Sequence, residues 1–315
     1  MDKLIYGLLS LLLSLLLTKF FIPVLYQLKF GQPIYEEAPE AHRKKQGIPT
    51  MGGVVFILVI SIVTILAAGI NGEHIFVILG MLLYGILGLV DDLIKVLLKD
   101  NQGLKARHKL LGQFVIAILI GYLVHSRASE ILIPFTSNTL KLGVLYYPFV
   151  IFFMLAMSNA TNLTDGIDGL SSSVSILSLI FFAVITHLTS QADLFVLSIV
   201  AIAALLGFLW HNKFPAKIFM GDTGSMALGG MFAVLMLLTQ TPLYAFFVCV
   251  IFVLESVSVI LQVLYFKRTG GKRLFKKTPI HHHFEESGYS ENQVVTLFVV
   301  INMIGVIVGT IIYRM

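Results

Sequence analysis

The sequence predicts an all-α integral membrane protein with about ten transmembrane helices, and two observations carry that prediction. Hydrophobic residues make up 57% of the 315 residues and charged residues 12%, and the mean hydropathy is +0.91, a composition typical of membrane-embedded chains. Apolar runs of spanning length also recur along the whole chain, so residues 1–315 are expected to form a single polytopic domain. The one cysteine, Cys249, lies inside an apolar run, which excludes a disulfide framework and a thiolate zinc cluster.

Hydropathy places the ten expected spans along the chain with short connections between them. The first run is too long for a signal-peptide core and no small-residue cleavage site follows it, so we interpret it as a membrane span. After the fourth span, short β-prone runs at 131–135 and 139–142 flank Thr-Ser-Asn and predict a small external β-hairpin. The expected spans cover residues 4–27, 52–70, 75–90, 111–125, 146–161, 171–188, 194–211, 223–240, 243–266 and 293–313.

The basic residues are divided unevenly between alternate connections. One set of connections holds nearly all of them, whereas the other set and the two termini hold only Lys3, Arg127, Lys141 and Arg314. The positive-inside rule therefore predicts that the basic set is cytoplasmic and that both termini lie outside, as an even number of spans requires. The basic set consists of Lys29, Arg43, Lys44, Lys45, Lys95, Lys99, Lys105, Arg107, Lys109, Lys213, Lys217, Lys267, Arg268, Lys272, Arg273, Lys276 and Lys277.

Acidic and amide side chains gather at the predicted cytoplasmic ends of the spans. Such side chains are costly at a membrane edge and are tolerated chiefly where they line a wet cavity or bind a ligand. The run from Ser158 to Leu170 is the densest, and the alternative, a polar connecting loop, would need only one or two of its polar residues. We therefore predict an active-site cleft at the cytoplasmic face. Its candidate residues are Asp91, Asp92, Asn159, Asn162, Asp165, Asp168, Asn212, Phe219 and Asp222.

Three of these carboxylates leave alternatives open. Adjacent residues on a helix differ by about 100° in direction, so we expect one of Asp91 and Asp92 to face the cleft and the other to face an adjacent helix or a lysine such as Lys95. A solvated helix end is the alternative for both. Asp222 lies at the N-terminus of the eighth span, where free backbone N–H groups and the helix dipole attract anions. For this residue, a helix cap and a metal ligand are equally well supported.

A histidine run and a lone glutamate lie in or near the last basic connection. His281, His282 and His283 are consecutive, so their side chains point in different directions, and no Glu-x-x-His or cysteine partner accompanies them. We therefore favour binding of phosphate oxygens over a transition-metal site. Glu255 lies in the middle of an apolar run, and we interpret it as a structural partner rather than a catalytic residue.

The cluster as a whole suits transfer of a phosphoryl-type group. Carboxylates without thiols, set among lysines and arginines, suit a hard cation that holds phosphates, which indicates Mg²⁺. No Gly-x-x-x-x-Gly-Lys-Ser/Thr, Gly-x-Ser-x-Gly or His-Glu-x-x-His motif is present. A site at the ends of spans implies that one substrate is a lipid. A cation-coupled transporter is the alternative from another class, and the collection of acids on one face, with only Glu255 near the midplane, argues against it.

Five motifs occur together in the chain: Thr50–Gly53, Asp91–Asp92, Asn159–Leu170, Phe219–Ser225 and Pro279–Glu285. In this order they resemble the phospho-N-acetylmuramoyl-pentapeptide-transferase family, a branch of the polyprenyl-phosphate hexose-1-phosphate transferase superfamily. The resemblance covers nearly the whole chain. The aspartate motifs are shared across the superfamily, whereas the histidine motif favours this branch over the N-acetylglucosamine-phosphate branch, which remains the alternative enzyme.

The resemblance implies a reaction and a set of roles. UDP-MurNAc-pentapeptide and undecaprenyl phosphate would give lipid I and UMP with Mg²⁺, in the bacterial cytoplasmic membrane, at the start of the lipid stage of peptidoglycan synthesis. It implies a homodimer in many cases, and no nucleic-acid partner is expected. Asp222 would bind Mg²⁺, and Asp91 would act as the base on the lipid phosphate with Asp92 beside it. Substrate-binding roles would fall to Lys45, Asn162, Asp165 and Phe219 at the uridine, to Asn212, His282 and His283 at the diphosphate or sugar, and to Thr50, Asn159, Asp168 and His281.

Overall fold

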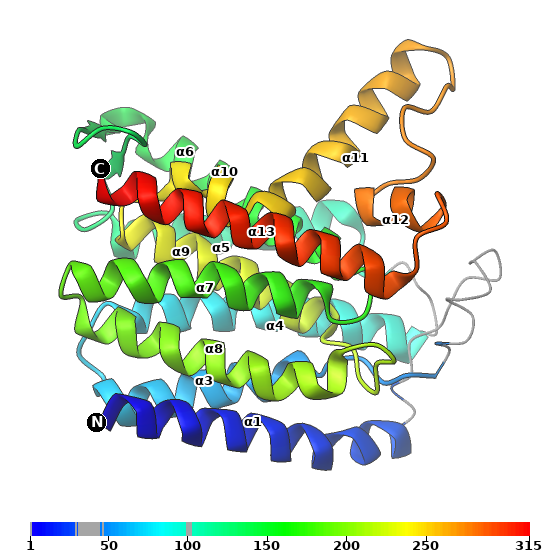
Figure 1. Cartoon of the computed structure of the whole chain (residues 1–315), viewed down its shortest axis with the longest axis horizontal. Coiled ribbons are helices and arrows are strands. Elements are labelled where there is room, and N and C mark those ends of the chain that lie inside the picture. Colours follow the sequence, from blue (N-terminus) through cyan, green and yellow to red (C-terminus); the bar gives the residue numbers. More distant parts are fainter. Residues whose placement is uncertain (1, 29, 31–44, 46, 99–102) are drawn as a thin grey trace.

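The computed structural model describes residues 2–28, 30, 45, 47–98 and 103–315. Within these residues nine helices are long and apolar enough to cross a membrane, and the 16-residue helix α3 is a shorter apolar one. This confirms the predicted all-α membrane protein with roughly ten helices. Figure 1 shows both termini at one end of the helix bundle. These ten helices are α1 (Asp2–Gln27), α3 (Gly53–Ala68), α4 (His74–Leu98), α5 (Ala106–Val124), α6 (Tyr146–Thr164), α7 (Leu170–Leu188), α8 (Ala192–Asn212), α9 (Gly221–Leu238), α11 (Val250–Arg268) and α13 (Glu291–Arg314).

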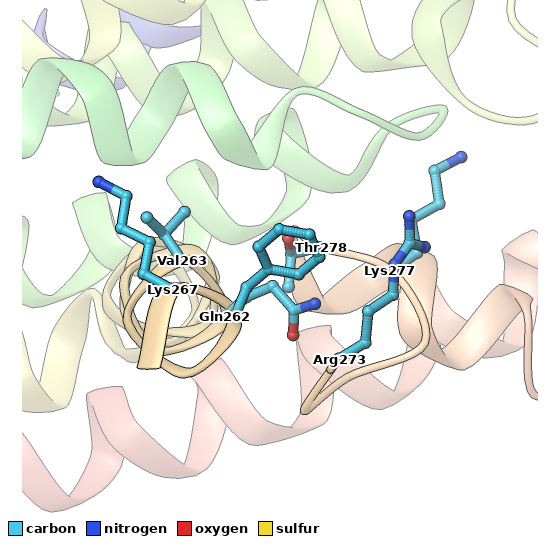
Figure 2. A pocket seen from close by; sticks show the side chains of 7 residues that line it. Gln262, Val263, Lys267, Arg273, Lys277 and Thr278 are labelled. Atoms are coloured by element: carbon cyan, nitrogen blue, oxygen red, sulfur yellow. The ribbon is translucent and has the colours of Figure 1, made fainter. Parts of the chain in front are cut away.

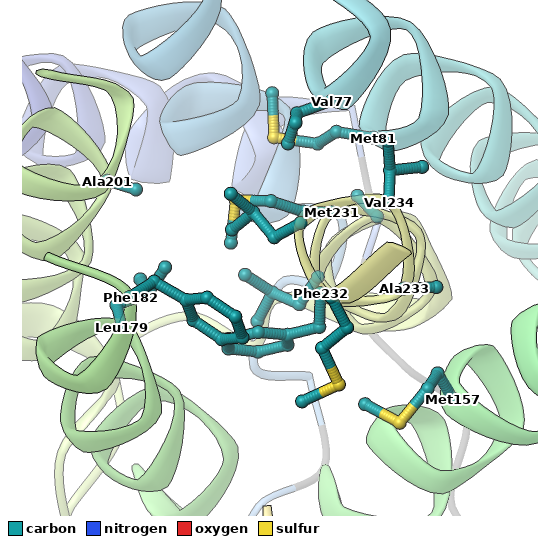
Figure 3. Close-up of a cluster of buried hydrophobic side chains, with 14 of the residues drawn as sticks. Val77, Met81, Met157, Leu179, Phe182, Ala201, Met231, Phe232, Ala233 and Val234 are labelled. Carbon is teal, nitrogen blue, oxygen red and sulfur yellow. The ribbon is translucent and has the colours of Figure 1, made fainter. Parts of the chain in front are cut away.

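Helix α9 forms the centre of the bundle. Every residue from Thr223 to Leu238 is buried, and α4 and α6 pack along it. Figure 3 shows Met231 and Phe232 of α9 among side chains from α4, α6 and α7, including Met81 and Phe182. A helix that is surrounded by protein on all sides can hold its N-terminus at a fixed depth, and that N-terminus carries Asp222.

Two glycines allow the helices to approach closely at the start of α9. A Cβ atom on Gly88 of α4 would lie 2.2 Å from the carbonyl oxygen of Asp222, and one on Gly53 of α3 would lie 2.3 Å from the Cα atom of Gly224. Real Cβ atoms do not approach so closely, so any side chain at these positions would push α3 or α4 away. The small residues therefore bring α4 into contact with the N-terminus of α9, at what we call the site end of the bundle, opposite the chain termini.

Helix α4 is longer than the sequence predicts. The expected third span ends at residue 90, whereas α4 continues to Leu98. Hydropathy stops at Asp91 because it registers the carboxylates as polar, although both are buried against other helices. The two aspartates therefore lie within a continuous helix, and one further turn brings Lys95 next to Asp91.

The expected ninth span is broken at Cys249. A 3₁₀ turn (η2, Pro242–Tyr244) and the short helix α10 (Ala245–Val248) precede the break, and α11 begins at Val250. The hydroxyl of Ser178 donates a 2.6 Å hydrogen bond to the carbonyl of Val248, which satisfies a backbone group that the break frees inside the membrane. Hydropathy could not reveal this break, because the residues on both sides of it are apolar.

Beyond the break, α11 leaves the bundle. Figure 1 shows it running outward at an angle to the other helices and returning through a segment that leads to the short helix α12 (Ile280–Glu285). Apolar side chains on several faces of α11, such as Ile260, Leu264 and Phe266, are exposed. A helix that exposes apolar side chains on several faces and is not covered by protein there is suited to contact with lipid.

The predicted hairpin is present at the end of the bundle that carries the termini. Strands β1 (Glu130–Leu132) and β2 (Thr139–Lys141) pair antiparallel, with Ile131 opposite Leu140. A short 3₁₀ turn (η1, Gly143–Leu145) then leads into α6. The hairpin is tied to the bundle by the Leu132 N–H, which donates a 2.7 Å hydrogen bond to the carbonyl of Gln240. It lies far from the site end (Figure 1).

Candidate active site

The carboxylate of Asp222 is at the centre of a charged cluster at the site end. One of its oxygens, Oδ2, accepts hydrogen bonds from the ammonium groups of Lys95 (2.9 Å) and Lys109 (2.7 Å). The other, Oδ1, accepts a 2.9 Å hydrogen bond from the side-chain amide of Asn162. Helices α4, α5, α6 and α9 therefore each contribute one polar group to a single point, as the sequence predicted for Asn162 and Asp222.

Asp91 belongs to the same cluster through Lys95. The ammonium of Lys95 lies 2.7 Å from Asp91 Oδ2 and 2.9 Å from Asp222 Oδ2, so one cation bridges two carboxylates. The other oxygen of Asp91 accepts a 2.8 Å hydrogen bond from the backbone N–H of Leu104. Asp91 is buried, and its charge is balanced by lysine rather than by solvent.

Asp92 faces a different partner, the N-terminus of α9. Its Oδ1 accepts a 3.1 Å hydrogen bond from the backbone N–H of Asp222. Its Oδ2 accepts hydrogen bonds from the backbone N–H (2.9 Å) and the hydroxyl (2.7 Å) of Thr223. The two backbone donors are among the four N–H groups that a helix leaves unpaired at its start. Asp92 thus caps α9 from a neighbouring helix, and the two adjacent aspartates point in different directions as expected.

A second charged cluster joins Lys45 to the connection between α6 and α7. The ammonium of Lys45 lies 2.6 Å from Asp168 Oδ1 and 2.6 Å from Glu291 Oε1. Glu291 also accepts a 2.5 Å hydrogen bond from the backbone N–H of Asp168, and Asp168 Oδ2 accepts one of 2.8 Å from the N–H of Ala216. These contacts connect four segments that are distant in the sequence.

Asp165 is influenced by carboxylates of both clusters. The residue is partly exposed at the turn that separates α6 from α7, but its carboxyl group is enclosed by protein. Burial raises the pKa of the Asp165 carboxyl well above its usual range, and the negative charges of Asp222, Asp92 and Asp168 raise it further. This carboxyl group is therefore protonated more readily than a solvated aspartic acid, and it can donate a hydrogen bond while it is neutral.

Two predicted substrate-binding residues, Asn159 and Asn212, make hydrogen bonds within the bundle. The amide of Asn159 donates to Gln113 Oε1 (3.0 Å) and to the carbonyl of Leu155 (2.7 Å). Asn212 is 2% exposed, donates to the carbonyl of Ile218 (3.0 Å) and accepts from the hydroxyl of Ser172 (2.9 Å). Both side chains hold helices and loops in place.

Thr50 and Phe219 are brought together by paired loops. The N–H of Phe219 donates to the carbonyl of Pro49 (2.8 Å), and the N–H of Gly52 donates to the carbonyl of Phe219 (2.9 Å). Thr50 is buried beside Gly221, where an added Cβ atom would lie 2.6 Å from the threonine hydroxyl. Phe219 is only partly buried beside the start of α9.

The three histidines have three separate partners. His281 is fully buried, and its Nδ1 lies 3.0 Å from Glu255 Oε1. The N–H of Lys276 donates to His283 Nδ1 (3.2 Å). His282 Nδ1 lies 2.8 Å from Glu285 Oε2, and burial lowers the pKa of His282, although Glu285 opposes the shift. The described residues contain no group of three His, Cys, Asp or Glu side chains arranged to hold a metal ion.

Glu255 is a structural partner of His281, in agreement with the interpretation of its sequence context. Glu255 is fully buried in α11 and holds the histidine ring against the connection between α6 and α7. A Cβ atom on Gly166 would lie 2.2 Å from His281 Nε2, so the histidine packs directly on this connection. Within the described residues that nitrogen is buried and has no hydrogen-bond partner.

Sequence reasoning missed Lys109 and Glu291 as members of the site, whereas it named Lys95 as a possible partner of the Asp91–Asp92 pair, and the structure confirms that contact. Lys109 was assigned to the basic connections that set topology, and nothing local distinguishes it from the other lysines there. The spacing of Lys95 four residues after Asp91 was a usable signal, because such pairs meet on one face of a helix. Glu291 had no comparable signal, since its partners lie more than 120 residues away.

Comparison with known proteins gives consistent results. Residues 74–240 match the family described as glycosyl transferase family 4, and residues 45–57 match phospho-N-acetylmuramoyl-pentapeptide-transferase signature 1. A phospho-N-acetylmuramoyl-pentapeptide-transferase of Clostridium botulinum (strain Alaska E43 / Type E3) is 45% identical over 94% of this chain and 92% of its own length. Proteins of the same name from Clostridium novyi (43% identical over 98% and 96%) and Listeria monocytogenes (44% over 92% and 91%) are similar over comparable lengths.

Proposed function

We propose a reaction for this chain from one premise: the chain belongs to the phospho-N-acetylmuramoyl-pentapeptide-transferase family, whose members are membrane transferases of peptidoglycan synthesis. The reaction moves phospho-MurNAc-pentapeptide from UDP-MurNAc-pentapeptide to undecaprenyl phosphate and gives lipid I and UMP. The site end faces the cytoplasm, in agreement with the distribution of basic residues. The observation that carries the proposal is the position of the Lys95 cation between the carboxylates of Asp91 and Asp222.

The cluster around Asp222 is suited to Mg²⁺ together with a diphosphate. Mg²⁺ in phosphate-binding sites is usually held by one or two carboxylates, and the remaining ligands are water and phosphate oxygens. The Lys95 ammonium already lies between the carboxylates of Asp91 and Asp222. A position that holds one cation between two carboxylates supports the proposal that Mg²⁺ fits there. Asp222 would hold the ion, with Asp91 next to it. The ion would supply positive charge to the diphosphate and to the leaving UMP.

The chemical step is a direct displacement. An oxygen of the lipid phosphate attacks the β-phosphorus of the nucleotide, the new P–O bond forms, and the bond from that phosphorus to the oxygen of the α-phosphate breaks, so that UMP leaves. Two anions must meet, and Lys95 and Lys109 reduce their repulsion. Asp91 orients the lipid phosphate or accepts its proton, since the second pKa of a phosphate monoester is about 6.

The remaining polar residues bind and position the nucleotide. The Phe219 ring stacks on the uracil, and Lys45 and Asp165 bind its polar edge. His282 and His283 contact the diphosphate or the sugar. Asp92 is a positioning residue, because all its hydrogen bonds within the described residues go to the start of α9.

The reaction is tested by the release of UMP from purified protein. UMP should appear only when UDP-MurNAc-pentapeptide, undecaprenyl phosphate and Mg²⁺ are all present. Release from UDP-GlcNAc in place of the muramoyl nucleotide would indicate the N-acetylglucosamine-phosphate branch. No release from either nucleotide would contradict the transferase proposal for this chain.

The displacement is tested with labelled nucleotide and no lipid. A direct step gives no UMP and no labelled protein under these conditions. Stoichiometric UMP release, with label bound to Asp91 or Asp92, would establish a covalent intermediate instead. The direct step also predicts that Asp91→Asn loses less activity as the pH rises, because the lipid phosphate is then deprotonated without help.

The role of Asp222 is tested by Asp222→Asn, which should abolish transfer and leave the protein folded. Asp193→Asn is a matched control, because Asp193 begins a membrane helix at the other end of the bundle. Near-normal activity of Asp222→Asn with an unchanged Mg²⁺ requirement would remove this residue from the metal site.

A further inference from the structure

A basic pocket lies at the tip of α11, outside the site described above. It has a volume of about 310 Å³ and is formed between the last turns of α11 and the segment that returns to α12. Figure 2 shows Lys267 and Lys277 on opposite sides of it, with Gln262 and Thr278 between them. Its lining consists of Gln262, Val263, Phe266, Lys267, Arg273, Lys277 and Thr278.

Hydrogen bonds hold the returning segment in place. Gln262 Oε1 accepts from the backbone N–H groups of Leu274 (3.1 Å) and Phe275 (2.9 Å). The guanidinium of Arg273 donates to the carbonyl of Lys276 (3.1 Å), and the N–H of Lys276 donates to His283 Nδ1 (3.2 Å). The pocket is therefore built by the fold rather than by a loose arrangement of side chains.

The charge of the pocket is not balanced by nearby acids. The chain has no Asp or Glu from residue 256 to residue 284, while it has six lysines and arginines between 267 and 277. Lys267, Arg273 and Lys277 form no salt bridge with a carboxylate in the part of the chain that the structure describes. Three cations around one cavity favour an anionic ligand.

The apolar side of the pocket places that ligand at a lipid surface. Val263 and Phe266 are 44% and 46% exposed on a helix that leaves the bundle and exposes apolar side chains on several faces. Their side chains lie where lipid chains would cover α11, and the basic residues follow directly at its end. A cluster of Lys and Arg beside the end of a membrane helix is a typical contact for anionic lipid head groups.

We propose that this pocket binds the phosphate head group of an anionic bilayer phospholipid. Arg273 and the two lysines contact the phosphate oxygens, and Val263 and Phe266 contact the start of the acyl chains. The volume equals that of roughly ten water molecules at about 30 Å³ each, which accommodates a phosphate with its glycerol. The acceptor lipid of the proposed reaction is a different ligand, because its phosphate must reach Asp91 and Asp222, which do not line this pocket.

The proposal is tested by lipid binding without turnover, so its outcome does not depend on the proposed reaction. The dissociation constants of dioctanoyl-phosphatidylglycerol and dioctanoyl-phosphatidylcholine are measured by native mass spectrometry in a neutral detergent. Wild-type protein should bind the anionic lipid more tightly. Lys267→Gln with Lys277→Gln should weaken that binding by roughly 30-fold, at the usual contribution of a basic residue at an anionic membrane surface, and leave phosphatidylcholine binding unchanged.

The matched control is Arg268→Gln with Lys272→Gln, which removes two charges from the same segment outside the pocket. This variant should retain most of the affinity for phosphatidylglycerol. An equal loss in both variants would mean diffuse surface charge and no specific pocket. A rise in the KM for undecaprenyl phosphate in the pocket variant, with phosphatidylglycerol binding intact, would assign the pocket to the acceptor lipid and overturn the proposal.

Discussion

Replacing Asp92 with asparagine removes the charged cap of α9 while preserving the shape of the side chain. The aspartate accepts three hydrogen bonds, two from backbone N–H groups and one from the Thr223 hydroxyl. An asparagine keeps one oxygen, and its amide group faces donors that it cannot accept from. At least one buried donor at the start of α9 then loses its partner.

The expected loss of stability follows from the number and kind of these bonds. Removal of an N-cap costs about 0.5–2 kcal/mol, and a hydrogen bond to a charged group contributes about 1.5–3 kcal/mol, so we expect Asp92→Asn to lower the free energy of unfolding by roughly 2–4 kcal/mol. Activity should fall as well, because Asp222 is positioned by the same cap.

The single buried cysteine provides the assay. Cys249 is fully buried and reacts with a thiol reagent only when the protein opens. If opening is in rapid equilibrium, a loss of roughly 2–4 kcal/mol should accelerate labelling by about 30- to 700-fold. Thr223→Val removes only the hydroxyl donor and should have a smaller effect, and Thr223→Ser, which keeps it, serves as the control. If Asp92→Asn abolishes activity and Cys249 stays as protected as in the wild type, Asp92 acts in catalysis and the argument for a cap is wrong.

Three further predictions concern the charged residues. Lys109→Met should increase the affinity of the protein for Mn²⁺ in the absence of substrate, because the lysine competes with the ion for Asp222. Electron paramagnetic resonance of the free ion measures this affinity, and unchanged or weaker binding would show that no competition exists. Burial lowers the pKa of His282, so the contribution of this histidine to stability is complete above pH about 6.5 and is lost as the pH falls below that value. His282→Gln should therefore make Cys249 labelling less sensitive to pH between about 6.5 and 5, and an unchanged pH profile would contradict the shift in pKa. The histidine run is not expected to hold zinc, so activity with excess Mg²⁺ should survive zinc-selective chelation, and a loss reversed only by Zn²⁺ would refute this.

Sequence alone was sufficient for the class of the protein and most of its spans. It also named Asp91, Asn162 and Asp222, which the structure brings together in one cluster. A membrane span can be found locally, because a run of about twenty apolar residues can satisfy its backbone hydrogen bonds in lipid only as a helix. Charged residues in or beside such apolar runs are exceptions that need an explanation, and the carboxylates of Asp91, Asp165 and Asp222 stood out for that reason. The hairpin was also predictable, since its register depends on a few neighbouring residues.

The tertiary structure decided which partner each of these residues has. Asp91 and Asp92 are neighbours in the sequence, yet one is paired with Lys95 and the other caps α9, because adjacent positions on a helix face different helices. The roles of Lys109 and Glu291, like the break at Cys249, depend on segments that are distant along the chain. Local patterns carry no information about such contacts, since a charge or a free carbonyl is satisfied by whichever group the packing of the helices brings to it.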